Sequence, residues 1–156
     1  MNVRPSVWVS ALVAATLVAC SSDVGVKVDD FKPAQLPAGI GTQVNLLKNV
    51  VKGNKLDGEL IAVTDTGLVL LLNSPLDTGA GPVRFVEAPF SLMRSARFDQ
   101  VGSAGIRSEG KAVDEARLER LRLLSRFPQG LGDELKARLL ATYGEAEIHL
   151  LTARTD

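Results

Sequence analysis

Residues 58–70 read GELIAVTDTGLVL, and this segment has the pattern of two strands joined by a tight turn. The half before the turn is rich in apolar and β-branched residues, which favours a strand. Asp65-Thr66-Gly67 is a turn signal, because glycine adopts a positive φ without steric cost. The continuous apolar run LVLLL at residues 68–72 predicts a central strand that is buried on both faces. We therefore expect a β-hairpin at the centre of the fold.

Further strands are expected on both sides of this hairpin. Residues 42–51 form a first apolar run, and the turn residues 52–55 (KGNK) separate it from the strand over residues 56–64. Residues 73–82 (NSPLDTGAGP) read as a loop. Strands over residues 83–87 and 92–98 follow, with a break at Pro89 between them. Because these connections are too short for crossovers, the sheet is expected to be mainly antiparallel.

The segment from Gly58 to Leu70 resembles the G-x-L-x-x-v-D-x-x-l-v-L hairpin of Sm-like proteins, with Asp65 before the turn. The resemblance implies a small antiparallel SH3-like/Sm-like β-barrel of bent strands over residues 42–100. Sm-like RNA sites commonly carry an Arg-Gly pair near the end of the barrel, and none follows Phe85 here. We expect the barrel and no contact with nucleic acid.

The rest of the chain, residues 101–156, is expected to form a loop and a helical pair packed on the barrel. Residues 102–110 are polar and glycine-rich, and residues 111–127 (KAVDEARLERLRLLSRF) read as an amphipathic helix that ends before Pro128. Its acidic residues come early and its arginines late, which suits the helix dipole and allows a Glu119–Arg122 pair. Its apolar stripe is Leu118, Leu121, Leu124 and Phe127, widened by Leu123.

A second helix is predicted over residues 133–143, with Gly144 at the position of a C-terminal capping glycine. Its apolar face consists of Leu131, Leu135, Leu139 and Tyr143, with Leu140 beside them. Residues 145–152 are expected to form a last short strand. The whole pattern predicts an α+β fold, with a small β-barrel followed by a two-helix C-terminal element.

The N-terminus, MNVRPSVWVSALVAATLVACSS, has the layout of a signal peptide. The apolar segment after Arg4 is shorter than the roughly 20 residues that a membrane-spanning helix needs. It ends in Leu17-Val18-Ala19-Cys20, which resembles the lipobox of bacterial lipoproteins. A soluble secreted protein, or a cytosolic one with a buried cysteine, is the alternative.

The lipobox resemblance implies where the chain is cut and how it is anchored. Leu17, Val18 and Ala19 would be read by the signal peptidase, residues 1–19 would be removed, and Cys20 would carry the lipid, with acyl groups such as palmitate. Residues 20–41 would then be the lipidated cysteine and an extended linker. Ser21 favours the outer membrane over the inner membrane, so we expect a lipid-anchored protein of the bacterial envelope that faces the periplasm.

The composition argues against several kinds of active site. Lys and Arg number 18 and Asp and Glu number 18, so no basic excess points to nucleic acid. Cys20 is the only cysteine and His149 the only histidine, which leaves too few ligands for a Cys/His metal site. His149 is expected to be a partly exposed strand residue. No G-x-S-x-G, H-E-x-x-H or P-loop motif occurs. We therefore predict no catalytic residues, no metal and no cofactor.

The function that fits these observations best is a non-enzymatic interaction or structural module. It would be tethered to the periplasmic side of a membrane and bind an envelope protein partner. The alternative is a small-ligand or lipid carrier or sensor, with a pocket between the barrel and the helices. The arginines at 117, 120, 122 and 126 are expected to lie on a solvated helix face, the alternative being contact with anionic lipid or an acidic partner.

Overall fold

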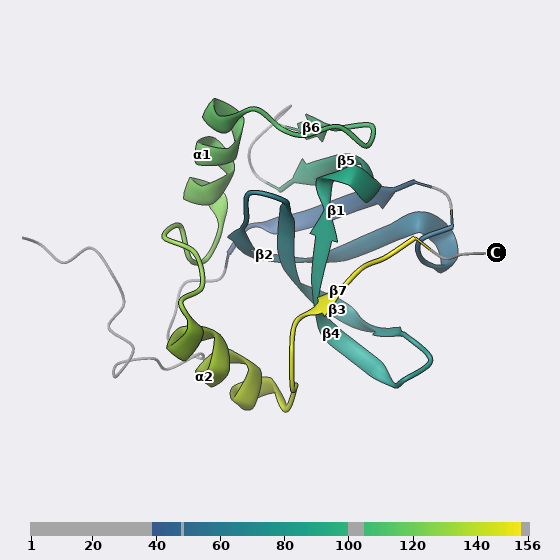
Figure 1. Ribbon diagram of the computed structural model, residues 1–156, viewed down its shortest axis with the longest axis vertical. Helices are drawn as coiled ribbons and strands as arrows, with labels where there is room; N and C mark the ends of the chain where they lie inside the picture. Colours follow the sequence, from purple (N-terminus) through teal and green to yellow (C-terminus); the bar gives the residue numbers. More distant parts are fainter. Residues whose placement is uncertain (1–38, 48, 100–104, 154–156) are drawn as a thin grey trace, which may run out of the picture.

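The computed structural model describes residues 39–47, 49–99 and 105–153 (Figure 1). Its longer strands are β1 (Gly41–Leu46), β2 (Lys55–Val63), β3 (Gly67–Asp77), β4 (Pro82–Pro89) and β5 (Met93–Phe98). Two short strands, β6 (Gly105–Arg107) and β7 (His149–Leu150), and the helices α1 (Glu115–Leu124) and α2 (Asp133–Tyr143) follow. Short 3-10 turns, η3 (Lys52–Asn54) and η4 (Phe90–Leu92), precede β2 and β5.

The seven strands form one sheet in the order β6-β5-β1-β2-β3-β4-β7, so the predicted α+β class is confirmed. All neighbours are antiparallel except β4 and β7, which run parallel with Val86 opposite His149. This exception arises because the chain returns to the sheet only after passing through both helices. The sheet is not a closed barrel, since β6 and β7 form its two edges and are not paired with each other.

The central hairpin forms as predicted. β2 and β3 pair up to Val63 and Leu68, and the amide of Thr64 donates to the carbonyl of Gly67 at 3.0 Å. A register shift between Leu60 and Ala62 bends β2. Because side chains alternate across a strand, this bent hairpin supplies apolar groups to both faces of the sheet.

Two apolar clusters lie on the two faces. The first contains inward-facing residues of β1 to β6 together with Leu118 and Leu121 of α1. The second lies on the other face of β2, β3 and β4, where Ile61, Val69 and Phe85 pack against α2. Phe85 meets Tyr143 of α2 edge to face, with ring centroids 5.2 Å apart. The two helices therefore cover different parts of the sheet rather than one barrel end.

Two predicted loops were wrong, because both segments join the sheet. Residues 73–82 were expected to be a loop, but β3 continues to Asp77 and β4 begins at Pro82. The turn between them is closed by the amide of Thr78, which donates to the carbonyl of Gly81 at 3.2 Å. Likewise β6 lies within the expected loop 102–110 and pairs with β5. Backbone pairing with a neighbouring strand overrides the loop-like composition in both cases.

Helix α1 is shorter than its predicted range of residues 111–127. It starts after Asp114, whose carboxylate accepts the amide of Arg117 at 3.0 Å as an N-cap. After Leu124 the chain is extended, and the amides of Arg126 and Phe127 donate to the carbonyls of Leu60 and Ile61. The residues after Leu124 thus form backbone hydrogen bonds with the bent part of β2 instead of continuing the helix.

Two details predicted for α1 were wrong, and the bounds predicted for α2 are confirmed. Leu123 does not widen the apolar stripe of α1, because it is 75% exposed. Arg122 does not pair with Glu119 but with Glu115 at 2.6 Å and with Asp65 at 2.8 Å. Helix α2 has its predicted bounds, with Gly144 in the left-handed conformation at its end.

Candidate functional site

The predicted lipidation residue, Cys20, and the signal-peptidase residues Leu17, Val18 and Ala19 lie outside the described residues. His149 lies half-buried in β7, opposite Val86. This confirms the prediction that it is a partly exposed strand residue. The described parts of the chain hold no group of three or more His, Cys, Asp or Glu residues that could bind a metal ion. No helix among them is long and apolar enough to cross a membrane.

The four arginines expected on one solvated face have separate environments. Arg122 lies between Glu115 and Asp65. The hydrogen bond that its guanidinium donates to the carboxylate of Glu115, aided by both negative charges, raises the pKa of Arg122. Arg126 is not solvated, since its side chain is only 7% exposed and contacts Glu59. Arg117 and Arg120 are exposed on another flank of α1. The expectation that all four arginines lie on a solvated helix face was therefore wrong for Arg126.

The described chain begins beside the helices. The amide of Gly39 donates to the carboxylate of Glu59, and the amide of Ile40 donates to the carbonyl of Leu124 at the end of α1 at 3.4 Å. Arg126 contacts the same carboxylate through Nε and Nη2, each 2.6 Å from an oxygen. This junction holds the first described residues, Gly39 and Ile40, beside β2 and the end of α1.

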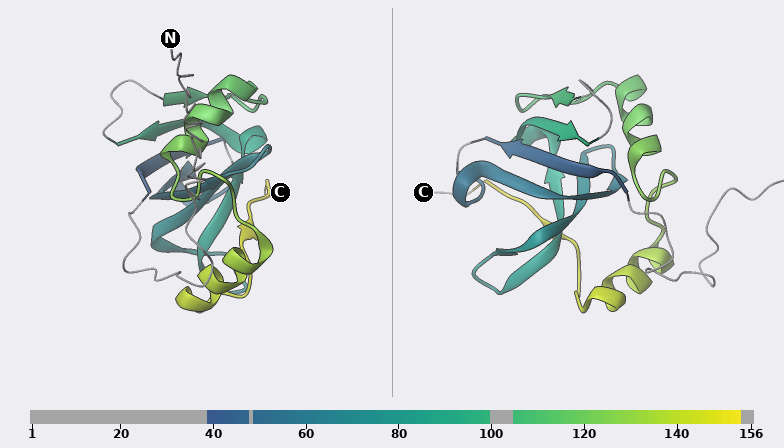
Figure 2. Two further views of the ribbon diagram at one scale, coloured as in Figure 1. Left: turned by 90° about the vertical axis from the view of Figure 1, so that its left-hand side faces the viewer. Right: turned by 180° about the vertical axis from the view of Figure 1, so that it is seen from behind.

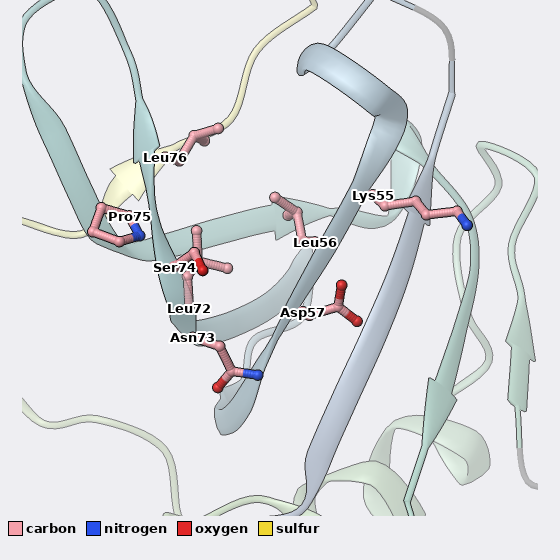
Figure 3. Close-up of a pocket in the computed structure, with 8 residues that line it drawn as sticks. All are labelled: Lys55, Leu56, Asp57, Leu72, Asn73, Ser74, Pro75 and Leu76. Carbon is pink, nitrogen blue, oxygen red and sulfur yellow. The ribbon is translucent and has the colours of Figure 1, made fainter.

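A polar cleft lies farther along β2, between that strand and β3. Lys55 and Asp57 project from one side of β2, and Leu56 projects from the other (Figure 3). The cleft has a volume of about 220 Å³. Its lining consists of Lys55, Leu56, Asp57, Leu72, Asn73, Ser74, Pro75 and Leu76.

The neighbouring strands extend this polar surface. Gln43 of β1 donates to Asp57 at 3.0 Å, and Asn45 donates to Ser95 of β5 at 3.1 Å. We call these residues, with Lys55, Asn73 and Arg97, the polar strand face. The alternation of charged residues at 55, 57 and 59 marks β2 as a strand with one wet side, but it does not distinguish exposed Asp57 from Glu59, which the fold covers.

A second hollow, which we call the α1–β6 groove, separates α1 from the ends of β5 and β6. Its volume is about 280 Å³. Its floor is apolar and consists of Phe98, Ile106, Leu121 and Leu124, with Gly105 at one side. Arg117 and Arg120 of α1 line its rim. The sequence stripe located Leu121 and Leu124, but the pairing of β5 with β6 that completes the groove was not predicted.

The described residues form two candidate binding surfaces, the polar strand face and the α1–β6 groove. A scan against protein-family models and searches of curated proteins and of solved structures found no match. The two surfaces differ in chemistry, since the polar strand face combines amides and both signs of charge, whereas the groove combines apolar side chains with two cations.

Proposed function

We propose that the chain is a lipid-anchored, non-enzymatic interaction module of the bacterial envelope, attached through Cys20 and facing the periplasm. The Leu17-Val18-Ala19-Cys20 motif supports the anchor, and Ser21 supports the outer membrane. Residues 21–38 would span the distance between the lipid and the fold, at roughly 3 Å per residue when extended.

The observation that carries the proposal is the position of the polar strand face relative to the start of the described chain. The chain begins beside Glu59 and the end of α1. Lys55 lies four residues away along β2, about 13 Å at the rise of a strand. Both helices lie on one side of the molecule, and the tip of the β3–β4 hairpin lies on the other (Figures 1 and 2). If the linker holds Gly39 toward the membrane, Asp57 and Asn73 would face away from the membrane.

We also propose that the chain belongs to the SH3-like class of small β folds. The neighbouring order β5-β1-β2-β3-β4, the bend in β2 and the η4 turn before β5 support this assignment. In this view β6, β7 and the helices are additions around a five-strand unit. The Sm-like hairpin from Gly58 to Leu70 would be its centre.

The experiment that tests the interaction proposal is site-specific photo-cross-linking in intact cells. A photoreactive residue replaces Asn73 in the polar cleft, and the matched control places it at Leu123, which is exposed on α1. We expect one dominant envelope protein to be captured from position 73, and the capture to be lost in the untethered Cys20→Ala chain. Equal capture from both positions, or none from position 73, would contradict the proposal.

A second candidate function is a carrier or sensor of a small apolar ligand. The α1–β6 groove favours it, because the groove lies between the sheet and a helix and has an apolar floor. This candidate requires bound lipid or another amphiphile to accompany a purified chain that lacks residues 1–20. A chain recovered without any such ligand, and unable to take one up, would exclude it.

A further inference from the structure

The charges of α1 are sorted onto two flanks. At 3.6 residues per turn, residues 117, 120 and 124 follow one side of the helix, and residues 115, 119 and 122 follow the other. The first side borders the α1–β6 groove with Arg117, Arg120 and Leu124. The second carries Glu115, which holds Arg122. The groove is therefore bordered by the cationic flank of the helix.

The two groove arginines differ in how far they are already neutralised. Arg117 approaches the capping carboxylate of Asp114, with Nε 3.6 Å from Oδ2. Arg120 makes no hydrogen bond or ion pair with the residues that the structure describes. Both side chains are exposed, so an anion can reach them without displacing a buried partner.

The floor of the groove suits a hydrocarbon chain. Phe98, Ile106 and Leu121 are at most 5% exposed and belong to the first apolar cluster. An apolar cavity of about 150 Å³ holds one benzene molecule, so a groove of about 280 Å³ has room for roughly ten carbon atoms. That is the size of one medium-length chain and much less than a phospholipid with two tails.

We propose that the α1–β6 groove binds a medium-chain fatty acid, with its hydrocarbon chain on the apolar floor and its carboxylate between Arg117 and Arg120. The proposal rests on the second candidate function and names its ligand class. Each guanidinium offers paired N–H donors that match the two oxygens of a carboxylate.

Two other occupants fit the groove less well. A peptide brings backbone N–H groups, and the side chains on the floor offer no acceptor for them, which leaves buried donors unpaired. An anionic bilayer is flat, so it could contact the exposed Arg117 and Arg120 but could not enter the groove to reach its apolar floor. A single small anion with an apolar tail meets neither difficulty.

The test uses NMR of a chain whose isoleucine methyl groups are labelled. Residues 21–156 serve for this purpose, because residues 39–153 contain both apolar clusters and the whole sheet. The chain has four isoleucines. Ile106 lies in the groove, while Ile61 and Ile148 lie in the second cluster and act as internal references.

Three probes with ten-carbon chains are titrated below their micelle concentrations: sodium decanoate, decyltrimethylammonium and decyl maltoside. We expect decanoate to shift the Ile106 methyl resonance saturably, with Ile61 and Ile148 unchanged, and the cationic probe to have no such effect. The variant R117E/R120E should raise the decanoate Kd by about tenfold or more, which corresponds to about 1.4 kcal/mol. The charge-matched variant R94E/R107E, whose residues are exposed outside the groove, should leave the Kd unchanged.

The outcomes separate this proposal from the carrier function on which it rests. Equal shifts of Ile106 with all three probes would overturn the fatty-acid proposal while leaving a carrier of apolar ligands. No shift of Ile106 with any probe would overturn both. Binding of the chain to phosphatidylglycerol vesicles in a way that depends on Arg117 and Arg120, without a decanoate response, would overturn the proposal in favour of a membrane surface.

Discussion

Arg126 and Glu59 connect the segment between the two helices to the second strand. Nη2 of Arg126 donates to Oε2 of Glu59 at 2.6 Å, and Nε lies 2.6 Å from Oε1. The amide of Gly39 donates to the same carboxylate. One side chain of β2 therefore holds the beginning of the described chain and the segment that follows α1. The two side chains are only 7% and 17% exposed, so water competes little for either.

Removing one partner of this pair should be costly. We expect Glu59→Leu to lower the free energy of unfolding by about 3–5 kcal/mol, because it leaves Arg126 as a buried charge without its carboxylate. The measurement is urea unfolding followed by circular dichroism. Glu134→Gln removes an exposed pair with Arg138 and should cost less than about 1 kcal/mol.

The double variant Glu59→Leu/Arg126→Met separates the pair from the packing around it. With both charges gone, no buried charge is left without a partner, and we expect most of the lost stability to return. Additive losses in the double variant would show that the two residues act independently, contrary to the contact between them.

The N-cap of α1 should contribute a smaller and separable amount. Asp114 accepts the amide of Arg117 at 3.0 Å, which satisfies one of the free donors at the helix start. Asp114→Ala should lower the free energy of unfolding by about 1 kcal/mol, whereas Asp114→Asn should cost much less because asparagine also caps helices. Unfolding curves of the two variants decide this, and equal losses would contradict a capping role.

Two neighbouring leucines of α1 should respond very differently to the same substitution. Leu121 is 4% exposed in the first apolar cluster, and Leu123 is 75% exposed. We expect Leu121→Ala to cost about 2–5 kcal/mol, the range for emptying a buried leucine site. Leu123→Ala should change stability by no more than about 0.5 kcal/mol. Thermal unfolding of both variants under the same conditions provides the comparison.

The features that the sequence predicted well are those determined by residues close together in the chain. The central hairpin follows from the turn at Gly67 and the apolar runs beside it. Helix α2 follows from its leucine spacing and from Gly144, which takes the left-handed conformation that glycine adopts easily. In both cases the deciding residues lie within one element or its turn.

The features that were missed depend on distant partners. β6 has three residues and β7 has two, and each exists because a neighbouring strand offers its edge. The last residues of the predicted first helix are not helical, because the amides of Arg126 and Phe127 donate to the carbonyls of Leu60 and Ile61. Arg126 looks like the other arginines in sequence, since its partner Glu59 is 67 residues away. The sequence suggested a pocket between the barrel and the helices as an alternative, but the residues that line the candidate surfaces could not be predicted. Each surface joins side chains from separate strands or from a strand and a helix.

The lipid anchor is a prediction from the sequence that a direct labelling experiment can test. Cells that express the full chain are grown with labelled palmitate, and the chain is isolated by affinity purification. We expect the wild-type chain and the control variant Ser22→Ala to carry the label, and Cys20→Ala to carry none, because the thiol of Cys20 is the acceptor that the lipobox implies. Label retained in Cys20→Ala would contradict the anchor.

The membrane predicted for this protein can be tested with one substitution. Ser21 follows Cys20, the predicted lipidation site, at the position where several bacteria read aspartate as a signal for retention in the inner membrane. We therefore expect the wild-type chain in the outer-membrane fraction of a density gradient and Ser21→Asp in the inner-membrane fraction. Palmitate labelling should be the same in both, because the substitution leaves Cys20 and the residues before it unchanged. A wild-type chain found in the inner membrane, unmoved by Ser21→Asp, would show that residue 21 does not determine the destination of this protein.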